Sequence, residues 1–212
     1  MSAITIHDLL FFCLPVAILL VLFVFIITGV RILKLSTQWK AEWYRKIAHV
    51  YSSAGILLAI VYLDQLQMIL FSLGLICGAV FWEKTKLESI DIDRDSYGPL
   101  LYALSILILS LSVLPEHKDS FAACILILGV SDTLAALVGQ RFGKQIPRFE
   151  KSTVGSLTFF LTVFVVYAML PITWIHVLSL SVLTTIIEFI SKKGIDNIAI
   201  PLLIVMYVSV FV

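Results

Sequence analysis

The chain has 212 residues, of which 60% are hydrophobic and only 14% are charged. No soluble fold of this size has enough interior to bury so much apolar surface. The composition therefore excludes a soluble enzyme, a disordered chain and a secreted disulfide scaffold, and it indicates a membrane protein with several spans. The formal net charge of only +1 argues against a nucleic-acid partner.

Apolar segments of about the length that a membrane helix needs, roughly 20 residues, follow one another along the chain. The expected spans cover residues 9–31, 47–63, 66–83, 97–115, 119–140, 152–170, 172–190 and 195–212. The first lacks a basic leader and a small-residue cleavage site, which favours an anchor over a signal peptide. We therefore expect a single integral-membrane domain over residues 1–212, an all-α polytopic transmembrane helical bundle of about eight spans, with seven as the alternative count.

Basic residues are concentrated in four loops that an eight-span bundle places on one side of the membrane. Residues 31–46 contain five Lys or Arg, 84–94 contain three, 141–151 contain four and 192–193 contain two, so that only Lys118 falls on the other side. By the positive-inside rule the basic side is cytoplasmic, and both termini then lie on the non-cytoplasmic side. Most acidic residues also fall on the cytoplasmic side. A cytoplasmic rim that carries both basic and acidic residues suits an anionic ligand with its metal ion. The alternative is that these residues belong to ordinary charged loops.

Asp132 lies well inside the apolar run of the fifth span. A carboxylate at the centre of a bilayer costs at least ~2.5–3.5 kcal/mol, so it should face the bundle interior and have a partner. It serves either as a metal or proton site, which we favour, or as a buried carboxylate that fixes the packing. Ala135 and Gly139 follow at three- and four-residue spacings, so they share its helix face and allow close approach of another backbone.

A basic loop follows this helix, and the next helix opens directly after it. Arg141, Gly143, Lys144 and Lys151 lie in the loop, and Ser152, Gly155 and Ser156 lie at the start of the next helix. The free N–H groups and the positive dipole end of a helix favour a phosphate. We expect these residues, together with Gly139, to form a phosphate cradle, although a positive-inside loop with a serine cap would show the same pattern. The soluble P-loop motif G-x-x-x-x-G-K-[ST] is absent.

Further ionisable residues gather at helix ends on the same side. Arg45, Lys46 and His49 open the second span, Glu83 ends the third, Glu188 ends the seventh, and Asp196 and Asn197 open the eighth. The basic trio is either a second contact for a polyphosphate or a collar that extends to the membrane surface. Each carboxylate is a candidate ligand for Mg²⁺, which takes one or two carboxylates together with waters and substrate phosphates.

The run Ser131-Asp-Thr-Leu-Ala-Ala-Leu-Val-Gly-Gln-Arg-Phe-Gly-Lys144, followed by Glu150-Lys-Ser-Thr-Val-Gly-Ser156, resembles the signature of the dolichol kinase / phytol kinase family. These are polytopic membrane lipid kinases, and the characterised members use CTP. The resemblance extends to residues 45–49, to Glu83, and to Glu188 with residues 194–201, and it covers nearly the whole chain from about Trp39. It departs at Val154, where longer members have Glu, and in the absence of their extra N-terminal spans.

The resemblance implies a phosphotransferase at the cytoplasmic rim of the bundle. It would move the γ-phosphoryl group of a nucleoside triphosphate, with CTP as the expected donor, to the hydroxyl of a polyprenol, a phytol-like isoprenoid alcohol or diacylglycerol. The implied phosphate contacts are Arg45, Lys144 and Lys151, and the implied Mg²⁺ ligands are Asp132 and Asp196, assisted by Glu83 or Glu188. One carboxylate or His49 would orient the attacking hydroxyl.

Two alternatives stay open. One is a cytidylyltransferase related to the CDP-diacylglycerol synthases, whose longer C-terminal signature is only partly present in Ser191-Lys-Lys-Gly-Ile-Asp-Asn197. The other is an ion- or proton-coupled transporter in which Asp132 is the ion site. A transporter favours inverted repeats and broken midplane helices, and the sequence shows no clear repeat.

Overall fold

The structure is a computed structural model that describes residues 37–85, 97–146, 149 and 151–211. The expected first span, residues 9–31, lies outside the described residues. The helices are α2 (Thr37–Tyr62), α3 (Gln65–Thr85), α4 (Gly98–Ser112), α5 (Lys118–Leu126), α6 (Asp132–Phe142), α7 (Thr153–Ala168), α8 (Trp174–Ile190) and α9 (Asp196–Phe211), and a five-residue π-helix, η1 (Ile127–Ser131), joins α5 to α6. The expected all-helical class is confirmed for this part of the chain.

The helix bounds agree with the seven other expected segments to within a few residues, with one exception. Helix α2 begins at Thr37 instead of residue 47, because a helix continues through charged residues where an apolar run stops. Residues 119–140, expected as one span, correspond to α5, η1 and α6 in direct succession. The loop expected before α7 contains two short antiparallel strands, β1 (Gln145–Ile146) and β2 (Lys151–Ser152), which pair Ile146 with Lys151.

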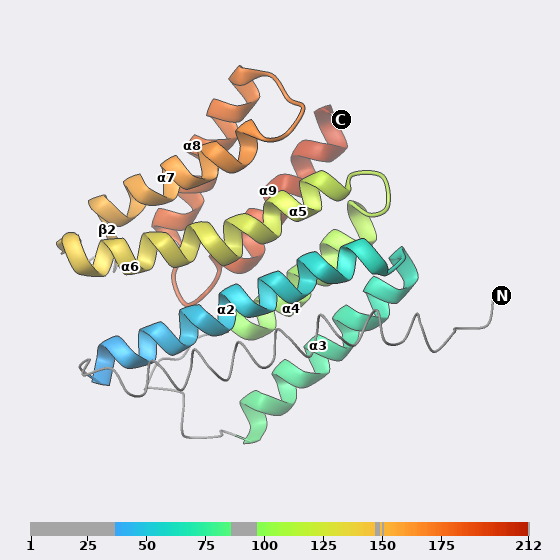
Figure 1. The fold of residues 1–212 in the computed structure, drawn as a ribbon, viewed down its shortest axis with the longest axis horizontal. Helices are drawn as coiled ribbons and strands as arrows, with labels where there is room; N and C mark the ends of the chain where they lie inside the picture. The colour runs from blue at the N-terminus through green and yellow to red at the C-terminus, as the bar shows by residue number, and fades with distance from the viewer. Residues whose placement is uncertain (1–36, 86–96, 147–148, 150, 212) are drawn as a thin grey trace.

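The continuous stretch α5–η1–α6 lies at the centre of the bundle (Figure 1). On one side α2 packs against α5 and η1, and on the other α7 packs against α6, with α8 next to α7. Helix α4 packs between α3 and α9. The core is formed by apolar side chains such as Ile106, Phe121, Ile125 and Phe159, which have no exposed surface.

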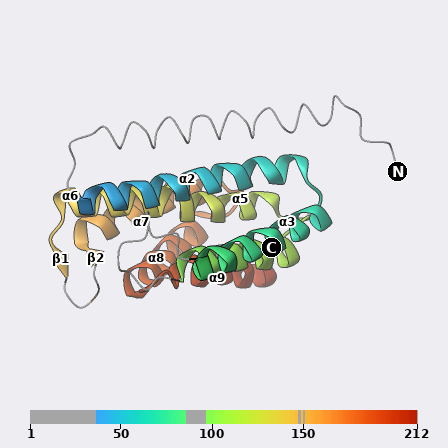
Figure 2. The ribbon, with the colours of Figure 1, turned by 90° about the horizontal axis from the view of Figure 1, so that it is seen from below.

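The strands β1 and β2 lie at one end of the bundle, and the turn between α2 and α3 lies at the other (Figure 2). We call these the strand end and the turn end. One described helical segment, Lys118–Phe142 with 25 residues, is long and apolar enough to cross a membrane, and the other apolar segments are shorter, at 10–17 residues. Leu157, Leu161 and Val165 on α7 are each more than half exposed. Apolar faces of this kind indicate a membrane protein.

Candidate active site

Lys46 of α2 and Asp132 of α6 form a buried ion pair. Lys46 is only 2% exposed, and its Nζ lies 2.5 Å from Asp132 Oδ2 and 3.4 Å from the Asp132 carbonyl oxygen. Asp132 is the first residue after the π-helix η1, and π-helical turns occur frequently at functional sites. The expectation that Asp132 faces the bundle interior and has a partner is therefore confirmed.

A second ion-paired group surrounds Lys151. Its ammonium group pairs with Glu188 of α8 and lies 3.8 Å from Asp196 Oδ2 at the start of α9. Glu188 is 3% exposed, so this carboxylate depends on Lys151 for its charge compensation. The group joins three elements, β2, α8 and α9, that are distant in the sequence.

The two groups belong to one electrostatic environment. Burial lowers the pKa of Lys151, but Glu188 and Asp196 outweigh this effect, and Asp132 adds to theirs, so that the pKa of Lys151 is raised above its ordinary value. Lys151 is therefore a cation at neutral pH, held among three carboxylates. In all, two lysines and three acids gather in this site.

The predicted glycine and serine residues lie where α6 meets α7. Ser152 is buried and caps α7, and its Oγ accepts a hydrogen bond from the Gly155 N–H at 3.0 Å. A Cβ at Gly139 would lie 2.7 Å from Ser152 Oγ and 3.0 Å from Gly155 Cα, and one at Gly155 would lie 2.9 Å from the Ala135 carbonyl oxygen. Gly143 also contacts Ser152. The close backbone approach is confirmed, whereas a phosphate contact by these residues stays a prediction.

Other predicted residues lie around these groups or elsewhere. Arg141 and Lys144 are exposed at the end of α6, and Ser156 Oγ is buried without a hydrogen-bond partner among the described residues. Asn197 donates a hydrogen bond from its side chain to the Gly98 carbonyl oxygen at 3.1 Å and so ties α9 to α4. The side chains of Arg45 and Glu83 lie outside the described part of the structure.

His49 lies one helical turn after Lys46 and has a neighbour that the sequence analysis missed. The ring of Tyr102 of α4 lies 4.7 Å from the His49 ring, and the Tyr102 hydroxyl lies 2.7 Å from Ser53 Oγ. Tyr102 is 7% exposed, and its ring packs against the imidazole from the side of α4. The only sequence signal for this role was a tyrosine within an apolar run, which is too common to single out a residue.

The acidic residues form no ready-made metal cage. Among the described residues, no three or more His, Cys, Asp or Glu side chains lie close enough together to hold a metal ion. Glu188 Oε2, however, is buried and has no hydrogen-bond partner in the described region. Since Mg²⁺ is usually bound by one or two carboxylates plus substrate phosphates, these donors fit a Mg²⁺ ion that arrives with a nucleotide.

The chain is similar to proteins of known activity. It is 37% identical over 129 residues to a phytol kinase of Synechocystis sp., which covers 55% of this chain and 54% of the relative. It is 26% identical over 169 residues to dolichol kinase sec59 of Schizosaccharomyces pombe, an alignment that covers 71% of this chain and 32% of the relative. It is 30% identical over 120 residues to the dolichol kinase of Saccharomyces cerevisiae, an alignment that covers 51% of this chain and 23% of the relative. No family model and no solved structure matches the chain.

The helical bundle with its buried lysine–carboxylate groups is thus combined with a similarity to kinases of phytol and dolichol. The chain is similar to phytol kinases and dolichol kinases, the family that its two signature runs resemble. The alignments span about half the length of the phytol kinase and less than a third of the length of the Saccharomyces dolichol kinase.

Proposed function

We propose that this protein transfers the γ-phosphoryl group of a nucleoside triphosphate to the hydroxyl of an isoprenoid alcohol. The observation that carries the proposal is the pair of lysine–carboxylate groups, Lys46–Asp132 and Lys151–Glu188–Asp196, in an otherwise apolar bundle. Two buried ion-paired groups are costly to desolvate and are weak contributors to stability. They are, however, the groups that phosphoryl transfer requires, because this reaction depends mainly on positioning and charge neutralisation.

In the proposed reaction the hydroxyl oxygen of the alcohol forms a bond to the γ-phosphorus. The bond from this phosphorus to the bridging oxygen breaks, the nucleoside diphosphate leaves, and the hydroxyl proton passes to a carboxylate, for which we assign Asp132. Lys46 and Lys151 exchange their carboxylate partners for phosphate oxygens, so each lysine keeps a compensating charge before and after nucleotide binding. Glu188 and Asp196 would hold Mg²⁺, which neutralises phosphate charge when bound with the nucleotide.

We further propose CTP as the donor and eight spans, with both termini on the non-cytoplasmic side. The donor rests on the family resemblance. The orientation is supported by the position of the site at the basic, strand end of the bundle. A membrane span within residues 118–142 is supported by the length of the stretch Lys118–Phe142, whose 25 residues give about 37 Å and so exceed the ~30 Å hydrocarbon core.

The reaction is tested with the purified full chain in vesicles that contain phytol, a polyprenol or diacylglycerol, with Mg²⁺ and CTP labelled in the γ- or the α-phosphate. We expect the γ label to appear in phytol or the polyprenol, and ATP run in parallel tests the donor. Asp132→Asn should abolish transfer, whereas its matched control Asp64→Asn, at the turn end, should not. Transfer of the α label alone would identify a cytidylyltransferase, and transfer of neither label would overturn the proposal.

The orientation is tested with Lys118→Cys and Lys144→Cys in a background without native cysteines, because Cys77 is exposed and would itself react. A membrane-impermeant thiol reagent added from outside intact cells should label position 118 and leave position 144 unlabelled until the cells are opened. Labelling of both positions from the same side would contradict the proposed topology.

A further inference from the structure

An apolar hollow of about 190 Å³ lies between α2 and α6, directly beside the Lys46–Asp132 pair. Its walls include Trp43, Ile47 and Val50 of α2 and Leu137 of α6, and Lys46 and Thr133 also line it. The exposed surface of the hollow is apolar, and the hollow lies next to the ion pair at which we place the reaction.

We propose that this hollow binds the first part of the hydrocarbon chain of the acceptor alcohol. The chain enters laterally from the bilayer between α2 and α6, and its hydroxyl end meets Lys46, Asp132 and Thr133. The inference rests on the proposed kinase function and deepens it, because it assigns the binding place of the lipid and the residue that positions its hydroxyl.

Thr133 provides an independent argument. It is 8% exposed, it lines the hollow, and its Oγ1 has no hydrogen-bond partner within the described residues. Buried polar groups nearly always have a partner, and one without a partner is costly. The hydroxyl of an alcohol whose chain lies in the hollow would supply it, since a hydroxyl both donates and accepts.

The size of the hollow sets what it can recognise. Pockets that enclose a whole ligand have volumes of about 300–1,000 Å³, so a hollow of about 190 Å³ holds only the beginning of a long chain. The remainder of the chain stays in the bilayer, which costs nothing because the lipid tails are equally apolar. We therefore expect the enzyme to select the group next to the hydroxyl and to tolerate chains of different length.

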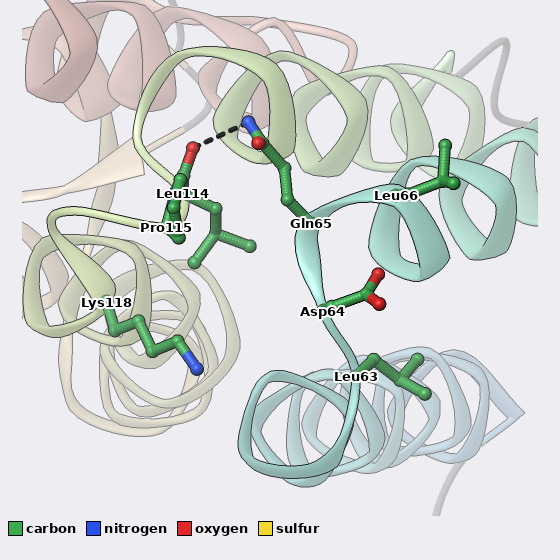
Figure 3. A pocket seen from close by; sticks show the side chains of 7 residues that line it. All are labelled: Leu63, Asp64, Gln65, Leu66, Leu114, Pro115 and Lys118. Atoms are coloured by element: carbon green, nitrogen blue, oxygen red, sulfur yellow. Dashed lines mark hydrogen bonds between the residues drawn. The ribbon is translucent and has the colours of Figure 1, made fainter. Parts of the chain in front are cut away.

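A larger cavity of about 370 Å³ lies at the turn end, but its polar groups have structural roles (Figure 3). Gln65 donates hydrogen bonds to the carbonyl oxygens of Leu114 at 2.7 Å and Ser110 at 3.1 Å. Asp64 accepts one from the Gln67 N–H at 2.8 Å, and Lys118 donates to the Ile60 carbonyl oxygen at 3.4 Å. These contacts fix helix ends, so we place the acceptor in the smaller hollow.

The inference is tested by photolabelling the reconstituted full chain with a diazirine-bearing isoprenoid alcohol in the absence of nucleotide. The label should attach to peptides of α2 and α6, and Val50→Trp or Leu137→Trp, which fill the hollow, should reduce it about tenfold, the scale of a packing mismatch in an apolar pocket. Leu157→Trp, on the exposed face of α7, is the matched control and should leave the photolabelling unchanged. The smaller change Val50→Phe serves if a tryptophan variant fails to fold.

The position of the hydroxyl is tested through Thr133. Thr133→Val keeps the shape and removes the hydroxyl, so kcat/KM for the alcohol should fall about tenfold, as for one lost hydrogen bond, while the KM for CTP is unchanged. Thr133→Ser should restore activity, whereas a purely structural residue would affect both substrates alike.

The outcomes separate the inference from the function on which it rests. The inference would be overturned if the photolabel attached to other helices, or if Val50→Trp and Leu137→Trp left photolabelling unchanged. This holds even where the γ-phosphate label is transferred. Label confined to the hollow without any transfer would support the binding site and overturn the kinase function.

Discussion

Both ends of the bundle carry charged residues, but they use them in different ways. At the strand end, Lys46 and Glu188 are buried, and each pairs with a charged side chain from another part of the chain. At the turn end, Asp64 and Lys118 are exposed, and each forms hydrogen bonds with helix-terminal groups close to it in space. Helix ends need such partners, whereas nothing in helix formation requires buried ion pairs between distant helices.

The cavities lead to the same distinction. The larger one lies among the helix-end contacts of the turn end, and the smaller one opens beside Lys46 and Asp132. Volume alone would select the turn end, whereas we place the proposed site at the strand end. We base the proposed site on charges that are buried, paired and left with unused polar atoms, such as Glu188 Oε2, because each carries a desolvation cost that folding alone does not require.

The largest effect is expected from breaking the Lys46–Asp132 pair. Lys46→Met leaves Asp132 charged and uncompensated, so the protein should lose all measurable transfer and about 3–5 kcal/mol of stability, as when one partner of a buried pair is removed. Thermal unfolding in detergent and transfer of the γ label measure the two losses. Lys118→Met, which changes an exposed lysine at the turn end, is the matched control.

The double variant Lys46→Met/Asp132→Leu separates the two losses. Replacing a buried ion pair by apolar side chains is often neutral or stabilising, so unfolding should return to the wild-type temperature while transfer stays absent. Recovery of transfer would show that the pair serves the packing of α2 on α6 and not the chemistry.

A smaller effect is expected where α6 approaches α7. In Gly139→Ala the new methyl group would lie 2.7 Å from Ser152 Oγ and 3.0 Å from Gly155 Cα, so the helices must separate, at a cost of about 1–3 kcal/mol. Gly74→Ala in α3 meets nothing within 4 Å and should be neutral or stabilising by up to ~1 kcal/mol. The unfolding temperatures of the two variants are compared with that of the wild type. Equal shifts in Gly139→Ala and Gly74→Ala would contradict the close contact of α6 with α7.

Much of the fold follows from the sequence, because apolar length alone sets most of the helices. The bounds of α7, including its cap at Ser152, follow from the change of a basic loop into an apolar run. The π-helix before Asp132 does not, since Ile127–Ser131 has no charge, and a single glycine, Gly129, is also tolerated within an α-helix. The two short strands were missed because two-residue pairing leaves no alternating pattern.

The site could be predicted as a set of residues but not as a set of pairs. Lys46 and Asp132 are separated by 86 positions, and only the packing of α2 on η1 and α6 brings them together. The close approach predicted for Gly139 is confirmed, with Gly155 on the other helix, whereas the phosphate cradle stays a prediction. Tyr102 was missed because its contact with His49 comes from a helix that carries no charge of its own.

At the turn end a loss of stability without a loss of activity is expected. Asp64 and Gln67 form reciprocal contacts at the start of α3, in which the Asp64 N–H donates to Gln67 Oε1 at 3.0 Å. Asp64→Ala removes one of them and should cost about 1 kcal/mol, as for other lost helix caps, with transfer of the γ label unchanged. A strong loss of transfer in this variant would mean that the two ends are not functionally distinct.

The smallest expected effect is the response of the Lys151 group to pH. Because Glu188 and Asp196 raise the pKa of Lys151 above its ordinary 10.5, its contribution to stability is complete below pH 10.5 and is lost only as the pH rises through the higher folded-state value. The difference in unfolding temperature between wild type and Lys151→Gln should therefore stay constant from about pH 7 to pH 10 and shrink above that range. If the two curves instead converge below pH 9, burial outweighs the carboxylates and Lys151 loses its proton near neutral pH. In that case Lys151 would not be a fixed cation, and Lys46 alone of these two lysines would separate the strand end from the turn end.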